Sequence, residues 1–383
     1  MLALTRASID LAAEWTVRRL LDEAGIAVDG THAWDLRVLD PSFYARVLRN
    51  PGLQLGETYM DGLWDCDAID ELVYRLYVSG VATAHERRAT FHVRNALARV
   101  RNRQSRARAD EVATAHYDLD TALYRAMLDE SLVYTCAYFR EPTDSLGVAQ
   151  QHKLAMICDK LDLRAGETLL DIGCGFGGLA AYAATYRGAR VVGITNSVQH
   201  AEVARARTAQ LPVEIRLLDY RDLPSLQRQF DKIASIEMIE AVGPKNYRVY
   251  MDVAHRCLVD GGRFLVQSFV SSTSQQVCNA WFDRYIFPNG VSPSFAQLAE
   301  ATESSFGAPK DVHDLGAHYP PTLLAWDRNL MAAWPQLAAR RRGPRFRRMW
   351  HFYLTSLAGV FRAEDLRLCQ IVYAKGPVGE IRA

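Results

Sequence analysis

Residues 169–180, LLDIGCGFGGLA, combine an acid with closely spaced glycines. Asp171, Gly173, Gly175 and Gly177 stand where an apolar run ends and a helical pattern begins. Glycines at such a turn let the backbone bend sharply and approach a ligand at the carboxyl edge of a sheet. The spacing GxGxG is a weak signal alone, because a plain tight turn or a dinucleotide site also has it. The loop therefore predicts a ligand site without identifying the ligand.

The ends of the next two apolar runs favour a methyl donor over a dinucleotide. GITNS (193–197) offers no acid to hold a dinucleotide ribose, whereas the following run ends in Asp219-Tyr220, a pair suited to adenine. The constellation resembles the class I S-adenosylmethionine-dependent methyltransferases, and Arg221 next to it is expected to be structural. The resemblance implies that Asp171 belongs to the cofactor site and that Gly173 and Gly175 face the methionine part. It also implies that Thr195 and Gln199 lie near the ribose. The Asp219–Tyr220 pair would then lie near the adenine.

The elements that position these residues read as alternating strands and helices. Short apolar runs separated by helical patterns are typical of βαβ units, which build a parallel, doubly wound α/β sheet. The fold class expected is therefore α/β, a Rossmann-like methyltransferase domain with a small N-terminal helical domain. The predicted strands are 167–173, 189–195, 213–219, 231–238 and 261–269.

Composition narrows the class of protein. At 383 residues the chain suits two domains, and no stretch approaches the roughly 20 apolar residues of a membrane-spanning helix. The N-terminus lacks a signal-peptide pattern, so we expect a cytoplasmic protein. Its seven cysteines are scattered without a CxxC pair, which favours reduced thiols and no metal site. A net charge of +1 argues against a nucleic-acid binder.

The first hundred residues differ from the rest. Residues 69–81 have the apolar spacing of a helix, and arginines crowd residues 87–108 and recur in RRRGPRFRR (340–348). We expect a helical docking domain with an arginine-rich linker over 1–105 and a catalytic domain over 106–383. The arginines suit an anionic membrane surface, although a solvated helix face or linker would have the same composition.

Five ordered blocks resemble one family. The cyclopropane-fatty-acyl-phospholipid synthases and the related mycolic acid cyclopropane synthases share their pattern, and LGETYMDGLWDCD (55–67) resembles the small helical domain of the phospholipid-acting branch. The blocks are HYDLDTALYRAMLDESLVYTCAYF (116–139), IEMIEAVGPKNY (236–247), WFDRYIFPNG (281–290), HYPPTLLAWDRNLMAAWP (318–335) and YLTSLAGVFRAEDLRLCQIVYAKG (353–376).

The resemblance implies a defined reaction. A cis alkene in a membrane phospholipid attacks the sulfonium methyl group, and a base removes a proton from the added methyl so that a cyclopropane closes. The intermediate cation needs a dry pocket and aromatic faces. The resemblance also implies a homodimer and a peripheral location on the inner face of the membrane.

Several residues acquire roles from the resemblance alone. Bicarbonate is the expected base, with Cys136 and Tyr319 donating hydrogen bonds to it and Glu240 accepting one. Tyr134 is an expected cofactor contact and Tyr117 an expected wall of the active site. Aromatic and apolar residues of the third block are expected to line an acyl tunnel, although a core would use the same types: Trp281, Phe282, Tyr285, Ile286 and Phe287.

One position departs from the family pattern. Gln267 stands where a histidine would bond the bicarbonate, and an amide donates a hydrogen bond but cannot take up a proton. Loss of a different proton would give a methylene-branched chain, and reduction of that chain a methyl-branched one, so a fatty-acyl C-methyltransferase is the first alternative. A methyltransferase for a small soluble substrate is the second, and a non-catalytic lipid-binding protein is the third. The helical, arginine-rich first hundred residues argue against the second.

Overall fold

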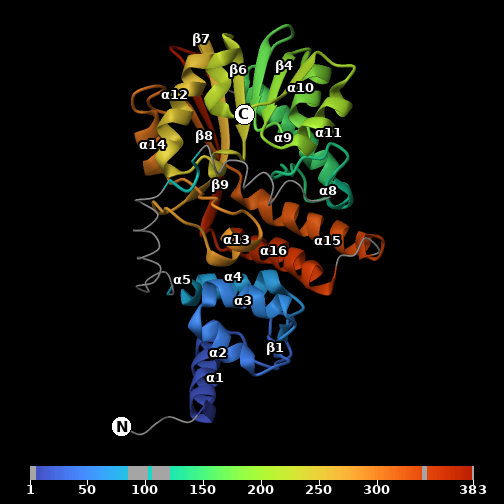
Figure 1. Ribbon diagram of the computed structural model, residues 1–383, viewed down its shortest axis with the longest axis vertical. Coiled ribbons are helices and arrows are strands. Elements are labelled where there is room, and N and C mark those ends of the chain that lie inside the picture. The colour runs from blue at the N-terminus through green and yellow to red at the C-terminus, as the bar shows by residue number, and fades with distance from the viewer. Residues whose placement is uncertain (1–5, 85–101, 106–120, 339–342, 382–383) are drawn as a thin grey trace.

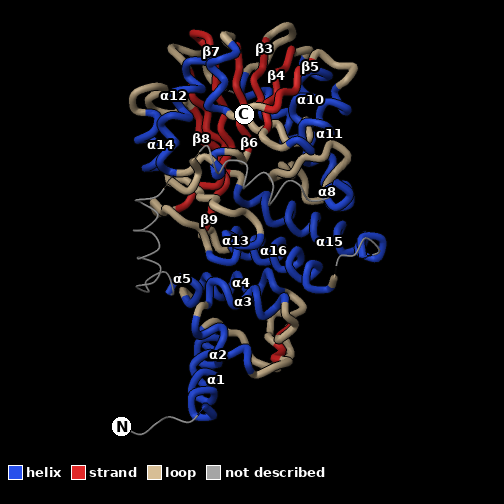
Figure 2. Tube along the Cα trace, in the orientation of Figure 1, coloured by secondary structure: helices blue, strands red, loops and turns tan. Residues whose placement is uncertain are grey.

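The computed structural model describes residues 6–84, 102–105, 121–338 and 343–381. A seven-stranded sheet with flanking helices forms one end of the molecule, and a small helical unit forms the other (Figures 1 and 2). The long helices α15 (Tyr319–Ala338) and α16 (Pro344–Arg362) lie between them (Figure 1). The architecture is that of a class I methyltransferase with an N-terminal helical region, as the sequence predicts.

The sheet has the strand order β5-β4-β3-β6-β7-β9-β8. Its first five strands along the chain are parallel to one another and match the predicted runs: β3 (Thr168–Ile172), β4 (Arg190–Thr195), β5 (Val213–Leu217), β6 (Phe230–Ile236) and β7 (Leu258–Ser271). The sequence analysis did not predict the two antiparallel strands β9 (Leu366–Ala374) and β8 (Asp311–Asp314). Strand β8 is short and polar, so it carries little apolar signal.

Helices cover both faces of the sheet. Leu169 faces the helices α9 and α10, whereas its neighbour Leu170 faces α12 on the opposite side, as the alternation of side chains along a strand requires. Burial on both faces explains why the strands are continuous apolar runs. The helices of this region are α8 (Thr121–Met127), α9 (Leu146–Leu161), α10 (Gly178–Arg187), α11 (Val198–Thr208), α12 (Tyr247–Cys257), α13 (Ala280–Tyr285) and α14 (Phe295–Thr302), with short turns η4 (Tyr220–Leu226), η5 (Ile239–Ala241), η6 (Pro244–Asn246) and η7 (Gly316–His318).

The N-terminal unit is helical apart from one small strand pair. It contains α1 (Arg6–Glu23), β1 (Arg37–Val38), α2 (Ser42–Arg49), α3 (Pro51–Met60), β2 (Trp64–Asp65), α4 (Ile69–Val78) and α5 (Val81–Ala84). Helix α4 confirms the helix predicted over 69–81. The predicted boundary at 105/106 adjoins residues outside the described ranges and stays a prediction.

The N-terminal helices share a buried apolar core with α15 and α16. Leu72 of α4, Trp326 of α15 and Leu354 of α16 are all fully buried in it. Helix α16 approaches α4 so closely that a β-carbon at Gly359 would lie 2.4 Å from the backbone oxygen of Asp70. A small residue at this point lets the two helices pack backbone to backbone.

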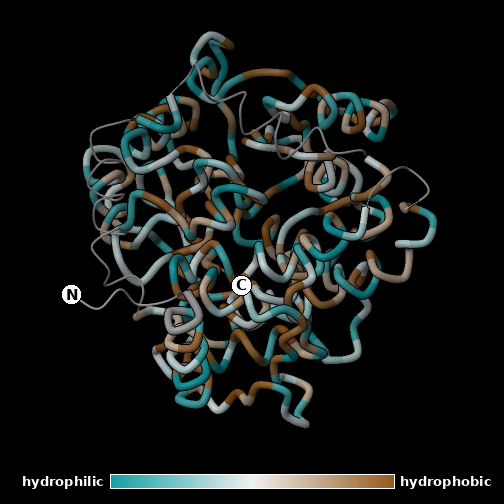
Figure 3. Tube along the Cα trace, turned by 60° about the horizontal axis from the view of Figure 1, so that its bottom comes forward, coloured by the Kyte–Doolittle hydropathy of each residue, from teal (hydrophilic) through white to brown (hydrophobic). Residues whose placement is uncertain are grey.

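Hydropathy is mixed along the helices rather than uniform. Coloured by this property, they show bands of hydrophilic and hydrophobic residues (Figure 3). Within the described ranges, none of the helices has the length and apolar character needed to cross a bilayer.

Candidate active site

The glycine loop follows β3 and opens a cavity of about 190 Å³ at the carboxyl edge of the sheet. Gly173, Gly175 and Gly177 have φ angles of +83°, +51° and +80°, a region that side-chain-bearing residues rarely adopt. Seven of the eight residues expected in the cofactor site line this cavity: Tyr134, Asp171, Gly173, Gly175, Thr195, Asp219 and Tyr220. Gln199 on α11 does not line it.

Two buried ionisable groups face this cavity. Burial raises the pKa of Asp171 to about 7, and its Oδ2 has no hydrogen-bond partner among the described residues. Lys153 of α9, which was not predicted, is also buried and donates to Thr135 Oγ1 at 2.7 Å. Burial lowers the pKa of Lys153 to about 8, against the opposing attraction of Glu237. An unpartnered carboxylate beside an ammonium fits the amino acid part of S-adenosylmethionine.

The acid–aromatic pair is held by Arg221. Asp219 caps η4 by accepting the Arg221 backbone N–H at 2.8 Å, and it accepts the guanidinium at 2.9 Å. The same guanidinium lies 4.6 Å from the centre of the Tyr220 ring and donates to the backbone oxygen of Gln104. Arg221 therefore orients both Asp219 and Tyr220, which is the structural role expected from the sequence.

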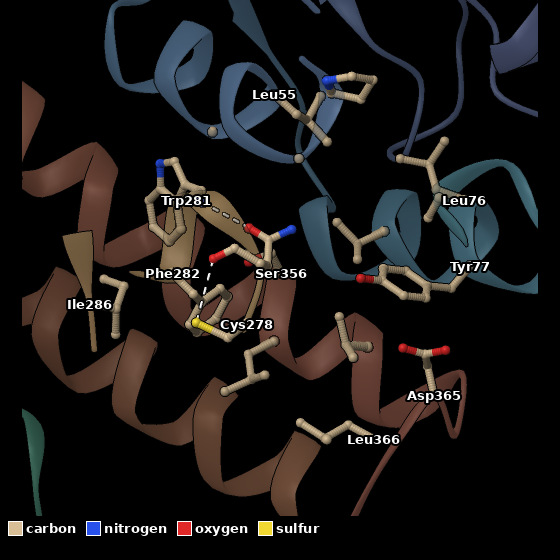
Figure 4. Close-up of a pocket in the computed structure, with 18 of the residues that line it drawn as sticks. Leu55, Leu76, Tyr77, Cys278, Trp281, Phe282, Ile286, Ser356, Asp365 and Leu366 are labelled. Atoms are coloured by element: carbon tan, nitrogen blue, oxygen red, sulfur yellow. Dashed lines mark hydrogen bonds between the residues drawn. The ribbon is translucent and has the colours of Figure 1, made fainter. Parts of the chain in front are cut away.

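A second, largely apolar cavity of about 450 Å³ lies between the N-terminal helices and α13 and α16. Figure 4 shows Leu55, Leu76 and Tyr77 from α3 and α4 facing it, opposite Phe282 and Leu366. Four of the five residues expected in an acyl tunnel line it, namely Trp281, Phe282, Ile286 and Phe287. Tyr285 does not; its hydroxyl donates to Glu57 at 2.7 Å.

The two cavities share Tyr134 and Glu237 among their lining residues. Tyr134 lies between α8 and α9 in the sequence, and its hydroxyl is 3.1 Å from that of Tyr353 on α16. Glu237 directly follows β6. A ligand over the glycine loop and a ligand in the apolar cavity would therefore meet at these two side chains.

Glu237 gathers three of the residues that the resemblance singles out. Its Oε1 accepts the backbone N–H of Cys136 at 3.0 Å and the side-chain amide of Gln267 at 2.7 Å. Its Oε2 accepts the hydroxyl of Tyr319 at 2.9 Å. Burial raises the pKa of Glu237, although these bonds act in the opposite direction. The sequence analysis missed this residue, although its place at the end of a predicted strand was a usable signal.

The contacts of these residues differ from those expected around bicarbonate. The Cys136 thiol donates to the backbone oxygen of Ala137 at 3.2 Å, and only its main-chain N–H reaches Glu237. Burial and the nearby Glu237 raise the pKa of this thiol well above its usual value, which keeps it protonated. Because Gln267 and Tyr319 also donate to Glu237, this set of donors does not fit a bicarbonate ion bound as the resemblance implied.

Glu240 lies on the short turn η5 and lines the larger cavity. Its Oε1 accepts the Ser268 hydroxyl at 2.9 Å and the Phe269 backbone N–H at 2.7 Å. Its Oε2 is buried without a hydrogen-bond partner in the described part of the chain. Burial, with a further contribution from Glu237, raises the pKa of Glu240 to about 7. Tyr117 lies outside the described residues.

Three described arginines of the two basic runs bond to other parts of the protein, whereas Arg347 of the second run is exposed. Arg103, from the tract at 87–108, pairs with Asp283 at 2.8 Å. In the second run, Arg345 pairs with Asp61 at 2.9 Å, and Arg348 donates to backbone oxygens of the N-terminal unit. These three side chains join the N-terminal and C-terminal parts of the chain or brace the site. Most arginines of the two runs lie outside the described residues, so the expected contact with an anionic membrane surface stays a prediction.

Comparisons with known proteins agree with this geometry. A family model described as mycolic acid cyclopropane synthetase matches residues 104–371. The chain is 43% identical to the cyclopropane-fatty-acyl-phospholipid synthase of Escherichia coli, over 95% of this chain and 94% of that protein. It is 31% identical to a tuberculostearic acid methyltransferase of Mycobacterium tuberculosis, over 86% of this chain and 81% of that protein. A solved mycolic acid cyclopropane synthase, complexed with SAH and CTAB, is 27% identical with a TM-score of 0.64, covering 69% of this chain and 97% of that one.

Proposed function

The chain belongs to the mycolic acid cyclopropane synthetase family of S-adenosylmethionine-dependent enzymes, and we propose that it transfers a methylene unit to the cis double bond of phospholipid acyl chains. The observation that carries this proposal is the meeting of two cavities at Tyr134 and Glu237. One contains the glycine loop with Asp171 and Lys153, and the other has a largely apolar lining that suits a fatty tail.

The glycine-loop residues bind and orient the methyl donor, whose sulfonium supplies an electrophilic carbon. Asp171 and Lys153 suit its amino acid part, whereas Thr195 suits the ribose and the Asp219–Tyr220 pair suits the adenine. Gly173 and Gly175 let the backbone come close to the ligand. Gln199 on α11 does not line the cofactor cavity, so its proposed contact with the ribose requires the ligand to extend beyond the lining residues.

The apolar cavity supplies the conditions that an alkene needs to react. An alkene is a poor nucleophile, and water would capture the cation that forms when it attacks the methyl group. The aromatic rings of Tyr134, Tyr319 and Tyr353 border the junction and can stabilise a positive charge with their faces. A dry, aromatic junction therefore favours transfer to carbon over transfer to water.

Access to lipid is assigned to the N-terminal unit. The acyl cavity is lined in part by α3 and α4, so a chain that enters there leaves its headgroup near this unit. Leu11 and Trp15 on α1 are 68% and 63% exposed, and side chains of these types suit a bilayer interface. Peripheral binding to an anionic, cytoplasmic membrane face and a homodimeric assembly belong to the same proposal.

The test uses labelled S-adenosylmethionine and vesicles of cis-unsaturated phospholipid. We expect each modified acyl chain to gain one CH₂ and to resist hydrogenation, as a ring does. Vesicles of the matching saturated phospholipid are the control and should take up no label. Label that appears without vesicles, on a small soluble compound, would overturn the proposal.

A branched product is the second candidate, because Gln267 replaces the expected histidine and relatives include a tuberculostearic acid methyltransferase. The hydrogenation step separates the two outcomes. A methylene branch takes up hydrogen, whereas a cyclopropane does not under mild conditions.

A further inference from the structure

We propose that the side-chain carboxylate of Glu237 is the built-in base of this reaction, so that turnover needs no bicarbonate. This inference rests on the proposed function and assigns a catalytic residue to it. Glu237 lines both the cofactor cavity and the acyl cavity, which is where a base must lie to reach the newly added methyl group.

The hydrogen bonds around Glu237 favour its ionised form, in opposition to the effect of burial. Three donors from separate segments converge on its two oxygens: the Cys136 backbone N–H, the Gln267 amide and the Tyr319 hydroxyl. A carboxylate has acceptor sites to spare beyond these three bonds. The donors therefore position Glu237 while leaving it able to receive a proton.

The amide of Gln267 is itself fixed in the orientation that a carboxylate requires. Gln370 on β9 donates to Gln267 Oε1 at 3.0 Å, so the Gln267 NH₂ group points to Glu237. An amide does not compete for the proton, because it is not basic in this range. The replacement that seemed to remove a base at residue 267 instead supports a carboxylate 30 positions earlier in the chain.

The backbone conformation of Glu237 also indicates a functional position. Its φ of +51° lies in the left-handed region, which is uncommon for residues other than glycine, asparagine and aspartate. Its N–H donates to the Gln267 backbone oxygen at 2.7 Å, which holds this turn at the end of β6. Strained backbone of this kind gathers at active sites, where surrounding structure maintains it.

A second anion beside Glu237 would meet like charge in a dry place. Glu240 is already close enough for Glu237 to raise its pKa, and Lys153 is a described basic group that attracts Glu237. Adding a bicarbonate here would require burial of one more negative charge without a cation of its own. The charges already present therefore disfavour a further anion beside Glu237.

The step balances without an added reactant. The π electrons of the alkene form the new bond to the methyl carbon, and the sulfur keeps the electron pair of the broken S–CH₃ bond. Glu237 then accepts a proton from the added methyl group. The electrons of that C–H bond form the second C–C bond of the ring and neutralise the cation.

The test compares the wild type with two variants in carbon-dioxide-free buffer, with and without added bicarbonate. We expect the wild-type rate to be the same in both, within about twofold. Glu237→Gly suits the positive φ and removes the carboxylate; its rate should fall by about 100-fold or more and recover at least tenfold with bicarbonate. Glu237→Gln fills the same space without a base and should show the loss with no recovery.

The outcomes separate this inference from the proposed function. A wild-type enzyme that is active only with bicarbonate, or a Glu237→Gln variant with more than about a tenth of the wild-type rate, would overturn the base assignment alone. A wild type that modifies no unsaturated phospholipid under either condition would overturn the function. Melting temperature and binding of S-adenosylhomocysteine report whether both variants are folded, and bicarbonate rescue is a readout that a structural role would not produce.

Discussion

Replacing Tyr319 by phenylalanine removes one hydrogen-bond donor from Glu237 and leaves the aromatic ring in place. The lost bond, 2.9 Å from hydroxyl to Oε2, is buried and charge-assisted, so it is worth about 1.5–3 kcal/mol. The bond stabilises the ionised carboxylate and not the acid. At 1.36 kcal/mol per pKa unit, its loss should raise the pKa of Glu237 by about one to two units.

The direction of the effect on activity follows from the role of Glu237 as a base. Only the ionised form accepts a proton, so the acid limb of the pH profile of kcat/KM should move up by about one to two units in Tyr319→Phe. At a pH below both limbs, the variant should be about 10- to 100-fold slower than the wild type. At high pH the two rates should converge.

The assay is label transfer to cis-unsaturated vesicles across pH 5 to 9 in carbon-dioxide-free buffer. Tyr353→Phe is the matched control, because it also removes a buried hydroxyl, one that bonds to Tyr134 and not to Glu237. Its acid limb should stay in place whatever its rate. A Tyr319→Phe profile that falls uniformly, without movement of the acid limb, would refute the reasoning.

Three other predictions concern stability and membrane binding. Burial raises the pKa of Glu240 to about 7 in the folded protein, so the cost of burying its charge is absent below about pH 4.5 and complete above pH 7. Glu240→Gln should therefore stabilise the fold against urea by up to about 3 kcal/mol at pH 8 and by little at pH 4.5. Equal effects at the two pH values would contradict this prediction. Gly359→Ala should destabilise the protein by about 1–3 kcal/mol through its clash with α4, whereas Gly147→Ala, with open space around it, should not. Neutral arginine replacements within 87–108 that spare Arg103 should weaken binding to anionic vesicles more at low salt than at high salt, and a salt-independent loss would count against the membrane role.

The parallel part of the sheet was predictable because its signal is local. Five strands buried on both faces appear as short apolar runs, and the glycines at 173, 175 and 177 mark the turn that follows the first. The edge strands β8 and β9 were missed, because β8 is polar and β9 carries Arg367 and Gln370 within it. Their pairing depends on distant partners, which periodicity does not report.

The cofactor residues were largely predictable for a similar reason. Six of them, all but Tyr134 and Gln199, lie at or just after the end of a predicted strand, and parallel strands bring their carboxyl ends to one edge. Lys153 was not predictable in this way, because it comes from the middle of α9 and reaches the site only when that helix packs on the sheet. Gln199 carried no signal except the resemblance, and it does not line the cavity.

Glu237 shows where a resemblance can divert attention from a neighbouring residue. In the motif EMIEAV, the family pattern assigns a role to Glu240 and none to Glu237, which stands three positions earlier. From the sequence alone, Gln267 indicated the loss of a proton acceptor. In the structure the two residues form one unit, because Gln267 donates a hydrogen bond of 2.7 Å to Glu237, the proposed acceptor. Without the donor at residue 267, the buried Glu237 carboxylate would lose one of its three hydrogen bonds, and without Glu237 the Gln267 amide would have no base to hold. Either single replacement, Glu237→Gly or Gln267→His, should therefore cost more activity than the double replacement Glu237→Gly with Gln267→His assayed with bicarbonate.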